Sequence, residues 1–235
     1  MKLYELSYLD LSLALIPVVI VAIIFARWLG DSRQVAYAAV RMLVQLLLVG
    51  YALQYIFAQD AKPLSLLVIC VMIVVSTAIA LRPVEALQTK HWQAALLGIA
   101  LGGSFNLLMV MVVVLHSEHW YKPALLIPLA GMVYANSMNA VSLAAERFAK
   151  EQGRGLPFLE SRNEAYGAAL LPQVNSLLAV GLVSLPGMMT GQILSGVSPL
   201  IAVRYQIMVM CMVLGSAGIS AAIYLWWMGR RQFSG

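Results

Sequence analysis

Polar side chains that could carry chemistry lie inside long apolar runs of this chain. Asn136 and Asn139 stand three residues apart in the run GMVYANSMNAVS, so on a helix they share one face. Arg41 and Gln45 are four residues apart in another apolar run and also share a face. Such groups line ion or substrate paths, or they form hydrogen bonds between helices. Both interpretations stay open, and Arg41 could also extend its guanidinium back to the membrane interface.

Amides and thioethers continue this inventory further along the chain. Asn175 opens the next apolar run, and Met188 and Met189 follow an interruption at Pro186. Thioether sulfur is a soft ligand that suits Cu(I), although most methionines are flexible apolar filler. Met188 and Met189 are the methionines to test as metal ligands, because they lie beside the irregular backbone at Pro186. We assign no other metal-binding residues.

Several kinds of chemistry are absent from the sequence. No segment matches GxxxxGK[ST], so ATP-driven work would need a separate subunit. The three histidines fall at the ends of the apolar runs, away from the hydroxyls inside them, which argues against a serine hydrolase and against an enzyme. The apolar runs hold no cluster of carboxylates, unlike most proton- or sodium-coupled carriers. We expect no cofactor.

The apolar runs decide the fold class. Hydrophobic residues make up 62% of the chain and charged residues 11%, against roughly 25% charged residues in soluble domains. A helix needs ~20 apolar residues to cross a bilayer, where its backbone must bond internally. We predict an all-α polytopic membrane protein, with a single transmembrane domain over 1–235. About seven transmembrane helices are expected, over 9–25, 35–57, 64–81, 92–115, 125–145, 173–194 and 206–228.

Basic residues are divided unequally between alternate loops. One set of loops holds ten of them and the other holds four: Lys2, Lys62, Lys122 and Arg204. The larger set is Arg27, Arg33, Arg82, Lys90, Arg147, Lys150, Arg154, Arg162, Arg230 and Arg231. Because the richer side faces the cytoplasm, the N-terminus is predicted outside and the C-terminus inside. The basic residues form no continuous stripe, which argues against nucleic acid as a partner.

Two segments depart from the regular pattern. The sixth span contains Leu185-Pro186-Gly187, and proline removes a backbone donor, so this span is predicted to be kinked or partly re-entrant at Pro186. Residues 146–171 are the longest polar stretch and are predicted as a cytoplasmic loop. Within it, residues 158–169 have a helical composition and predict a short helix along the cytoplasmic face; a solvated connector is the alternative.

Three stretches resemble one known family. They are 41–57 (RMLVQLLLVGYALQYIF), 127–141 (IPLAGMVYANSMNAV) and 180–210 (VGLVSLPGMMTGQILSGVSPLIAVRYQIMVM). The sequence resembles the FetB-type family of ABC transporter permeases, whose bacterial members are implicated in iron export and whose plant relatives are linked to aluminium tolerance. The SLPGMMTGQIL and RYQIMVM runs are the most specific part of the match.

The resemblance implies a permease subunit of the bacterial inner membrane that exports an iron-like metal ion. It implies a cytoplasmic ABC ATPase as partner, two copies of each subunit, and surrounding lipid. The 158–169 helix would dock into the ATPase, with Glu160, Arg162 and Glu164 as coupling residues by position. Relatives carry a longer loop before the sixth span, with a Gly-Ala turn that this chain lacks. The candidate path residues are Arg41, Gln45, Asn136, Asn139, Asn175, Met188 and Met189.

Two other functions stay open at this point. A stand-alone carrier or channel would use the amide-rich fifth span and transport without nucleotide. A non-transporting assembly or sensor subunit would use the polar loop only to bind a partner.

Overall fold

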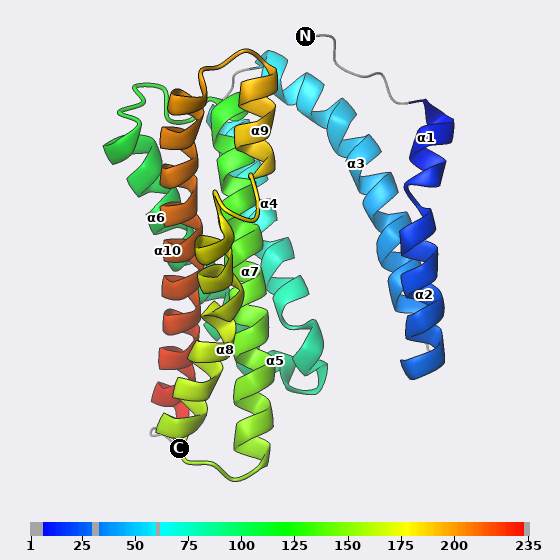
Figure 1. Cartoon of the computed structure of the whole chain (residues 1–235). Coiled ribbons are helices and arrows are strands. Elements are labelled where there is room, and N and C mark those ends of the chain that lie inside the picture. The colour runs from blue at the N-terminus through cyan, green and yellow to red at the C-terminus, as the bar shows by residue number, and fades with distance from the viewer. Residues whose placement is uncertain (1–6, 30–32, 60–61, 233–235) are drawn as a thin grey trace. The chain divides into compact units, whose positions relative to one another are not determined.

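The structure is a computed structural model that describes residues 7–29, 33–59 and 62–232 (Figure 1). These ranges form helices and contain no strand, which confirms the all-α prediction. The chain divides into two compact units, Met1–Asp60 and Ala61–Gly235. The assignment of 1–235 to a single permease domain stays a prediction.

The first unit is built from three helices: α1 (Tyr8–Leu13), α2 (Ile16–Leu29) and α3 (Arg33–Gln59). Ser7 caps α1, because its hydroxyl accepts from the Asp10 amide at 3.2 Å while the Asp10 carboxylate accepts from the Ser7 amide at 3.0 Å. This cap explains a carboxylate at the edge of an apolar run. Helices α2 and α3 pack together through small side chains, among them Ala22 and Ala39.

The second unit is a bundle around a core of alanine, leucine, valine and methionine side chains. Its predicted fourth span is not one regular helix, because two π-helical stretches interrupt it. The elements are α4 (Lys62–Ala80), the 3₁₀ helix η1 (Arg82–Leu87), α5 (Gln88–Leu97), the π-helix η2 (Gly98–Gly103), α6 (Ser104–Leu108), the π-helix η3 (Met109–Val114), α7 (Pro123–Gly153), α8 (Phe158–Ala179), α9 (Gly187–Leu194) and α10 (Pro199–Gln232).

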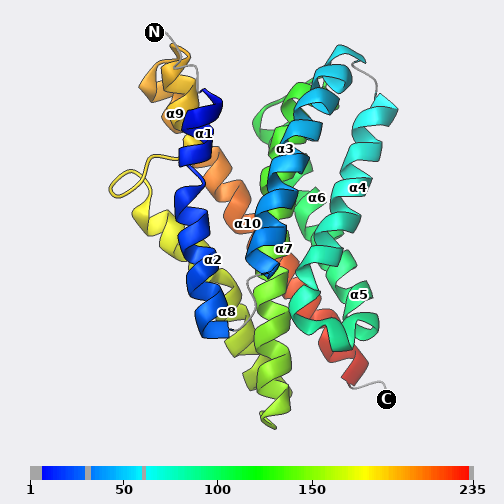
Figure 2. The ribbon, with the colours of Figure 1, turned by 90° about the vertical axis from the view of Figure 1, so that its right-hand side faces the viewer.

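Six segments of the described residues are long and apolar enough to cross a membrane. They are Leu9–Leu29, Arg33–Ile56, Lys62–Ala80, His91–Val114, Pro123–Gly153 and Pro199–Arg230. The sixth predicted span, 173–194, is not among them because it is divided between α8 and α9. Helix α8 runs back along α7, and α9 continues in the same direction beyond it (Figures 1 and 2). The two helices together therefore return the chain to the end where α7 begins.

The break in the sixth span lies at residues 180–186. Gly181 takes a left-handed backbone conformation with φ of 84°, and Pro186 precedes the first turn of α9. The Ala179 carbonyl accepts from the amides of Val183 and Ser184 at 2.8 and 3.2 Å. Proline has no amide hydrogen and disfavours helix in the residue before it, so the helix cannot continue through Leu185-Pro186. The predicted irregularity at Pro186 is thus a complete break between two helices.

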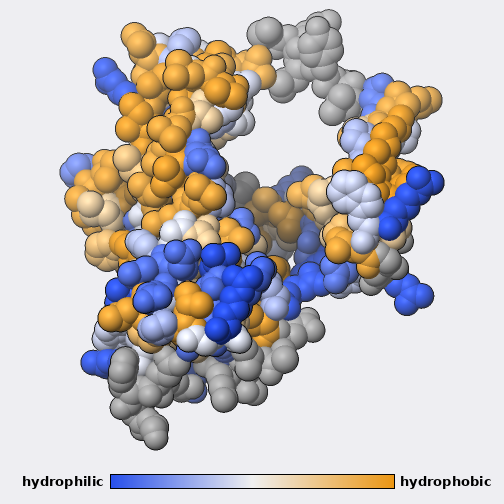
Figure 3. All heavy atoms as spheres, turned by 60° about the horizontal axis from the view of Figure 1, so that its bottom comes forward, coloured by the Kyte–Doolittle hydropathy of each residue, from blue (hydrophilic) through white to orange (hydrophobic). Residues whose placement is uncertain are grey.

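The polar stretch 146–171 is mostly helical, which corrects the predicted loop. Helix α7 extends to Gly153 and α8 begins at Phe158, so only residues 154–157 connect them. The predicted short surface helix is the first half of α8, which packs lengthwise on α7 because Ala165 and Ala169 on its inner face are fully buried. Hydrophilic side chains gather at this end of the second unit and hydrophobic ones cover the helices (Figure 3).

Glycines allow the closest helix contact in the second unit. A Cβ atom on Gly102 would lie 2.6 Å from the backbone nitrogen of Ser220 in α10, and one on Gly98 would lie 2.6 Å from the Ser220 carbonyl oxygen. The Ser220 hydroxyl in turn donates to the Ser137 hydroxyl of α7 at 3.0 Å. The Gly98–Gly102 pair thus brings η2, α7 and α10 together, as small residues do in membrane helices.

We predict that Gly102→Ala destabilises the second unit. The new methyl group would overlap backbone atoms of α10, and overpacking of this kind costs about 1–3 kcal/mol. Gly191→Ala in α9 is the matched control, because its Cβ atom would meet nothing within 4 Å. Thermal unfolding in detergent should show a lower Tm for Gly102→Ala alone; equal Tm values for the two variants would contradict the tight contact.

Candidate functional site

Arg41 and Gln45 lie on α3 of the first unit. Arg41 is half-buried and Gln45 is exposed. Neither side chain forms a hydrogen bond with another of the described residues, so both keep polar groups available for a ligand or another protein. Their proposed place on a path shared with the fifth span stays a prediction.

Asn136 joins α7 to α8. Its Nδ2 donates to the Met132 carbonyl of its own helix at 2.7 Å, and its Oδ1 accepts from Gln173 Nε2 of α8 at 2.8 Å. The Asn136 side chain is therefore engaged in holding two helices together, the interhelical alternative considered from the sequence. Gln173 was not among the candidate residues, although an amide beside Pro172 in an apolar run was a signal that could have identified it.

Asn139 borders a polar hollow between α7 and α8. The hollow has a volume of about 340 Å³ and is lined by Asn139, Ala140, Ser142, Leu143, Ala169, Pro172 and Gln173. Asn139 is exposed and forms no hydrogen bond with the described residues, in contrast to Asn136 one turn earlier. Asn139, Ser142 and Gln173 therefore line one space between α7 and α8, and Gln173 already donates its amide nitrogen to Asn136. Neutral oxygen donors of this type bind hard cations or the hydration shell of an ion.

The break between α8 and α9 offers a second group of oxygen atoms. The backbone carbonyls of residues 180–183 accept no hydrogen bond from the described residues. Leu182 and Val183 are 90% and 84% exposed. Unwound backbone is tolerated inside a membrane where protein or a water-filled cavity surrounds it. Discontinuous helices with free carbonyls form cation sites in transporters.

The other predicted path residues lie on both sides of this break. Asn175 is exposed on the last turns of α8, whereas Met188 and Met189 are half-buried in the first turn of α9. Met188 packs against the hydrophobic core, which favours a packing role for its thioether. Within the described residues, no three or more His, Cys, Asp and Glu side chains are grouped so that they could hold a metal ion.

The three predicted coupling residues point in different directions. Glu164 pairs with Arg147 of α7 at 3.3 Å, and Glu160 is exposed in the first turn of α8. Arg147 also lies 3.0 Å from Glu151, which pairs with Arg154 at 3.2 Å. The Arg147–Glu164 pair joins α7 to α8 near the turn that connects them, and the other two pairs lie within the end of α7.

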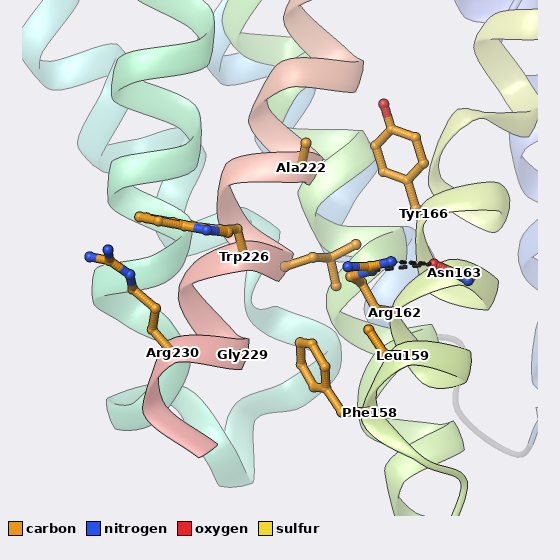
Figure 4. Close-up of a pocket in the computed structure, with 10 residues that line it drawn as sticks. Phe158, Leu159, Arg162, Asn163, Tyr166, Ala222, Trp226, Gly229 and Arg230 are labelled. Atoms are coloured by element: carbon orange, nitrogen blue, oxygen red, sulfur yellow. Dashed lines mark hydrogen bonds between the residues drawn. The ribbon is translucent and has the colours of Figure 1, made fainter. Parts of the chain in front are cut away.

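Arg162 instead enters a groove between α8 and α10, which we call the α8–α10 groove (Figure 4). The groove has a volume of about 750 Å³ and is lined by Phe158, Leu159, Arg162, Asn163, Tyr166, Ala222, Leu225, Trp226, Gly229 and Arg230. Arg162 donates to Asn163 Oδ1 from two nitrogen atoms, at 2.9 and 3.2 Å. The Arg230 guanidinium stacks on the Trp226 ring, 4.2 Å from its centre.

Comparison with known proteins gives a consistent family assignment. The model of the uncharacterised protein family UPF0014 matches residues 8–155 and 158–233, so the match is interrupted at the turn between α7 and α8. The UPF0014 membrane protein slr1647 of Synechocystis is 32% identical over 90% of this chain and 90% of its own length. No solved structure matches the chain.

Two further relatives have names that indicate a function. The "Probable iron export permease protein FetB" of Escherichia coli is 33% identical over 95% of this chain and 91% of its own length. "Protein ALUMINUM SENSITIVE 3" of Arabidopsis thaliana is 29% identical over 91% of this chain and 84% of its own length. With its six candidate membrane-spanning helices, the chain is a multi-pass inner-membrane protein that belongs to the UPF0014 family, to which FetB-type permeases are related.

Proposed function

We propose that the chain is the membrane-spanning permease subunit of an ABC transporter that exports an iron-like metal ion. The observation that carries the proposal is the polar hollow between α7 and α8, where Asn139, Ser142 and Gln173 face one space inside an apolar bundle. The name of the FetB relative supports iron export as the transport reaction. Because the sequence has no GxxxxGK[ST] segment, ATP hydrolysis would fall to a separate cytoplasmic subunit.

The hollow would receive the cation in steps of ligand exchange. Amide and hydroxyl oxygens replace part of the hydration shell without adding a fixed negative charge, so the ion is bound weakly enough to leave again. The free carbonyls of residues 180–183 would supply the next ligands further along α8. Asn136 would keep its structural role, since its amide already bonds within α7 and to α8.

The α7–α8 hairpin would transmit the movement of the ATPase. Its turn, residues 154–157, and the exposed Glu160 lie at one end of the second unit. The pairs of Arg147 with Glu151 and Glu164 stiffen the hairpin there. A force applied at the turn would then shift both walls of the hollow together. In this chain, the turn at residues 154–157 would take the place of the longer coupling loop that the FetB resemblance implies for other members.

A second copy of the chain would cover the broken span. Leu182 and Val183 project almost fully from the second unit at a point where the backbone is unwound. Lipid offers no hydrogen-bond partners for the carbonyls beside them. A symmetric dimer that meets at this break would shield the backbone and enclose the ion path between two protomers.

The orientation of the hairpin can be tested by labelling. In a background with Cys70 and Cys211 replaced by alanine, Gly153→Cys should react with a membrane-impermeant maleimide only after the cytoplasmic side is opened. Ser195→Cys, beyond α9, is the control and should react from the outside. Gly153 tolerates the change because its Cβ atom meets nothing within 4 Å. Labelling of position 153 from the exterior would invert the topology and remove the proposed ATPase contact.

Transport can be tested in a strain that lacks the chain. Deletion should raise cellular iron, and the intact gene should restore export. Asn139→Val with Ser142→Ala should reduce export about tenfold, because two oxygen ligands worth about 0.7 kcal/mol each are lost. Ser195→Ala is the matched control, since its hydroxyl only donates to the Gly191 carbonyl.

The same strain separates the proposal from its alternatives. The intact chain should co-purify with an ABC ATPase, and reconstituted vesicles should transport only with ATP. Transport without nucleotide would indicate a carrier or channel. Unchanged metal content on deletion, with no ATPase bound, would indicate a subunit that does not transport.

A further inference from the structure

The α8–α10 groove combines an apolar cleft with positive charge at one end. We propose that it binds an anionic phospholipid of the cytoplasmic leaflet, with an acyl chain between α8 and α10 and the phosphate held by Arg162. The proposal requires the C-terminus to be cytoplasmic, but it does not depend on what the protein transports.

The depth of the groove matches that of a lipid. Helix α10 is apolar from residue 207 to 228, and Ala222, Leu225 and Trp226 lie within the last two turns of that run. Arg230 follows immediately after it. The groove therefore crosses the boundary between hydrocarbon and headgroups, where tryptophan and tyrosine are enriched and where arginine extends toward phosphate.

The volume and the lining also fit a long apolar ligand. About 750 Å³ lies within the range of sites that bury small molecules. Apolar side chains from both helices form most of the wall, and the polar atoms come mainly from Arg162, Asn163 and Arg230. Figure 4 shows Arg162 reaching from α8 into the space beside α10, while Arg230 and the Trp226 ring lie together and point to the side of α10 away from Arg162.

The two arginines carry charge that the described residues do not neutralise. No carboxylate among them forms an ion pair with Arg162 or Arg230, and Glu164, two residues from Arg162, pairs with Arg147 instead. Two of the Arg162 nitrogen atoms donate to Asn163, which fixes the guanidinium and leaves its remaining donors for a ligand. A phosphate accepts from such a group strongly, and basic pockets between helices on the cytoplasmic side bind anionic headgroups.

A lipid fits this groove better than a segment of the ATPase. A soluble partner could approach Phe158 and Arg230 at the open end. It could not reach Ala222 and Tyr166, which lie deeper in the span. The acyl chains of the surrounding bilayer already have access to that part of the groove.

The test uses the full chain in nanodiscs that contain phosphatidylcholine with a small fraction of phosphatidylglycerol. Native mass spectrometry after release should show phosphatidylglycerol retained in preference to phosphatidylcholine. Arg162→Gln should weaken retention about fivefold, from about 1 kcal/mol per basic residue near the membrane. Arg230→Gln should weaken it less, because its side chain points to the side of α10 away from Arg162. Lys150→Gln, an exposed basic residue of α7, is the control for charge and should change retention less than twofold.

A second variant tests the acyl chain without a change of charge. Ala222 is exposed in the groove, so Ala222→Phe should fill the cleft and lower retention of phosphatidylglycerol while Tm stays near that of the parent. Millimolar inorganic phosphate should not displace the lipid. Unchanged retention in Arg162→Gln, or full displacement by phosphate, would overturn the proposal. Loss of dimer or of bound ATPase in Ala222→Phe, with lipid retained, would show a protein contact instead.

Discussion

Helix association in this bundle depends on two glycines, Gly98 and Gly102, at the contact between η2 and α10. Inside lipid, apolar surface gives helices little reason to leave the surrounding chains, so close packing and interhelical hydrogen bonds hold them together. Gly98 and Gly102 let η2 approach the backbone of α10 at Ser220, and the Ser220 hydroxyl reaches Ser137 of α7. A side chain at Gly102 would push η2 away from α10 at Ser220, the residue that also bonds to α7. The frame on which α8 packs exists because these positions are small.

The sixth span differs from the other spans because α8 packs on α7 over part of its length and ends at a break in the helix. Toward α7 it buries alanines and donates the Gln173 hydrogen bond, which fixes its register. Toward the other end of the molecule it stops at residue 179, because Gly181 and Pro186 prevent a continuous helix. The unwound stretch is costly inside a membrane unless protein or water surrounds it. Helix α8 is fixed to α7 by the Gln173 hydrogen bond, whereas the carbonyls of residues 180–183 accept no hydrogen bond from the described residues. A span of this kind is suited to movement at the break, since only its α8 part is fixed.

The sequence predicted the helices better than the contacts between them. Hydropathy located the spans, and Pro186 located the break, because both signals are local. The role of Asn136 could not be read from α7 alone, since its partner Gln173 lies 37 residues away. The predicted loop 146–171 contains the expected helix at 158–169 but is otherwise shorter, because α7 extends to Gly153 and its Arg147 pairs with Glu164 across the hairpin. The α8–α10 groove could not be predicted from the sequence, because its walls come from α8 and from the C-terminal turns of α10, which are far apart along the chain.

The charged segment of α8 cannot act as a single docking face. Successive residues of a helix are rotated by about 100°, so Arg162 and Glu164 are separated by about 200° and lie on opposite sides. The structure agrees, because Arg162 faces α10 and Glu164 bonds to α7. A soluble partner that binds this end of the protein therefore meets Glu160 and the turn at 154–157, while Arg162 remains on the side that lipid can reach. The same two turns of helix thus present one surface to α7 and the hairpin turn and another to α10.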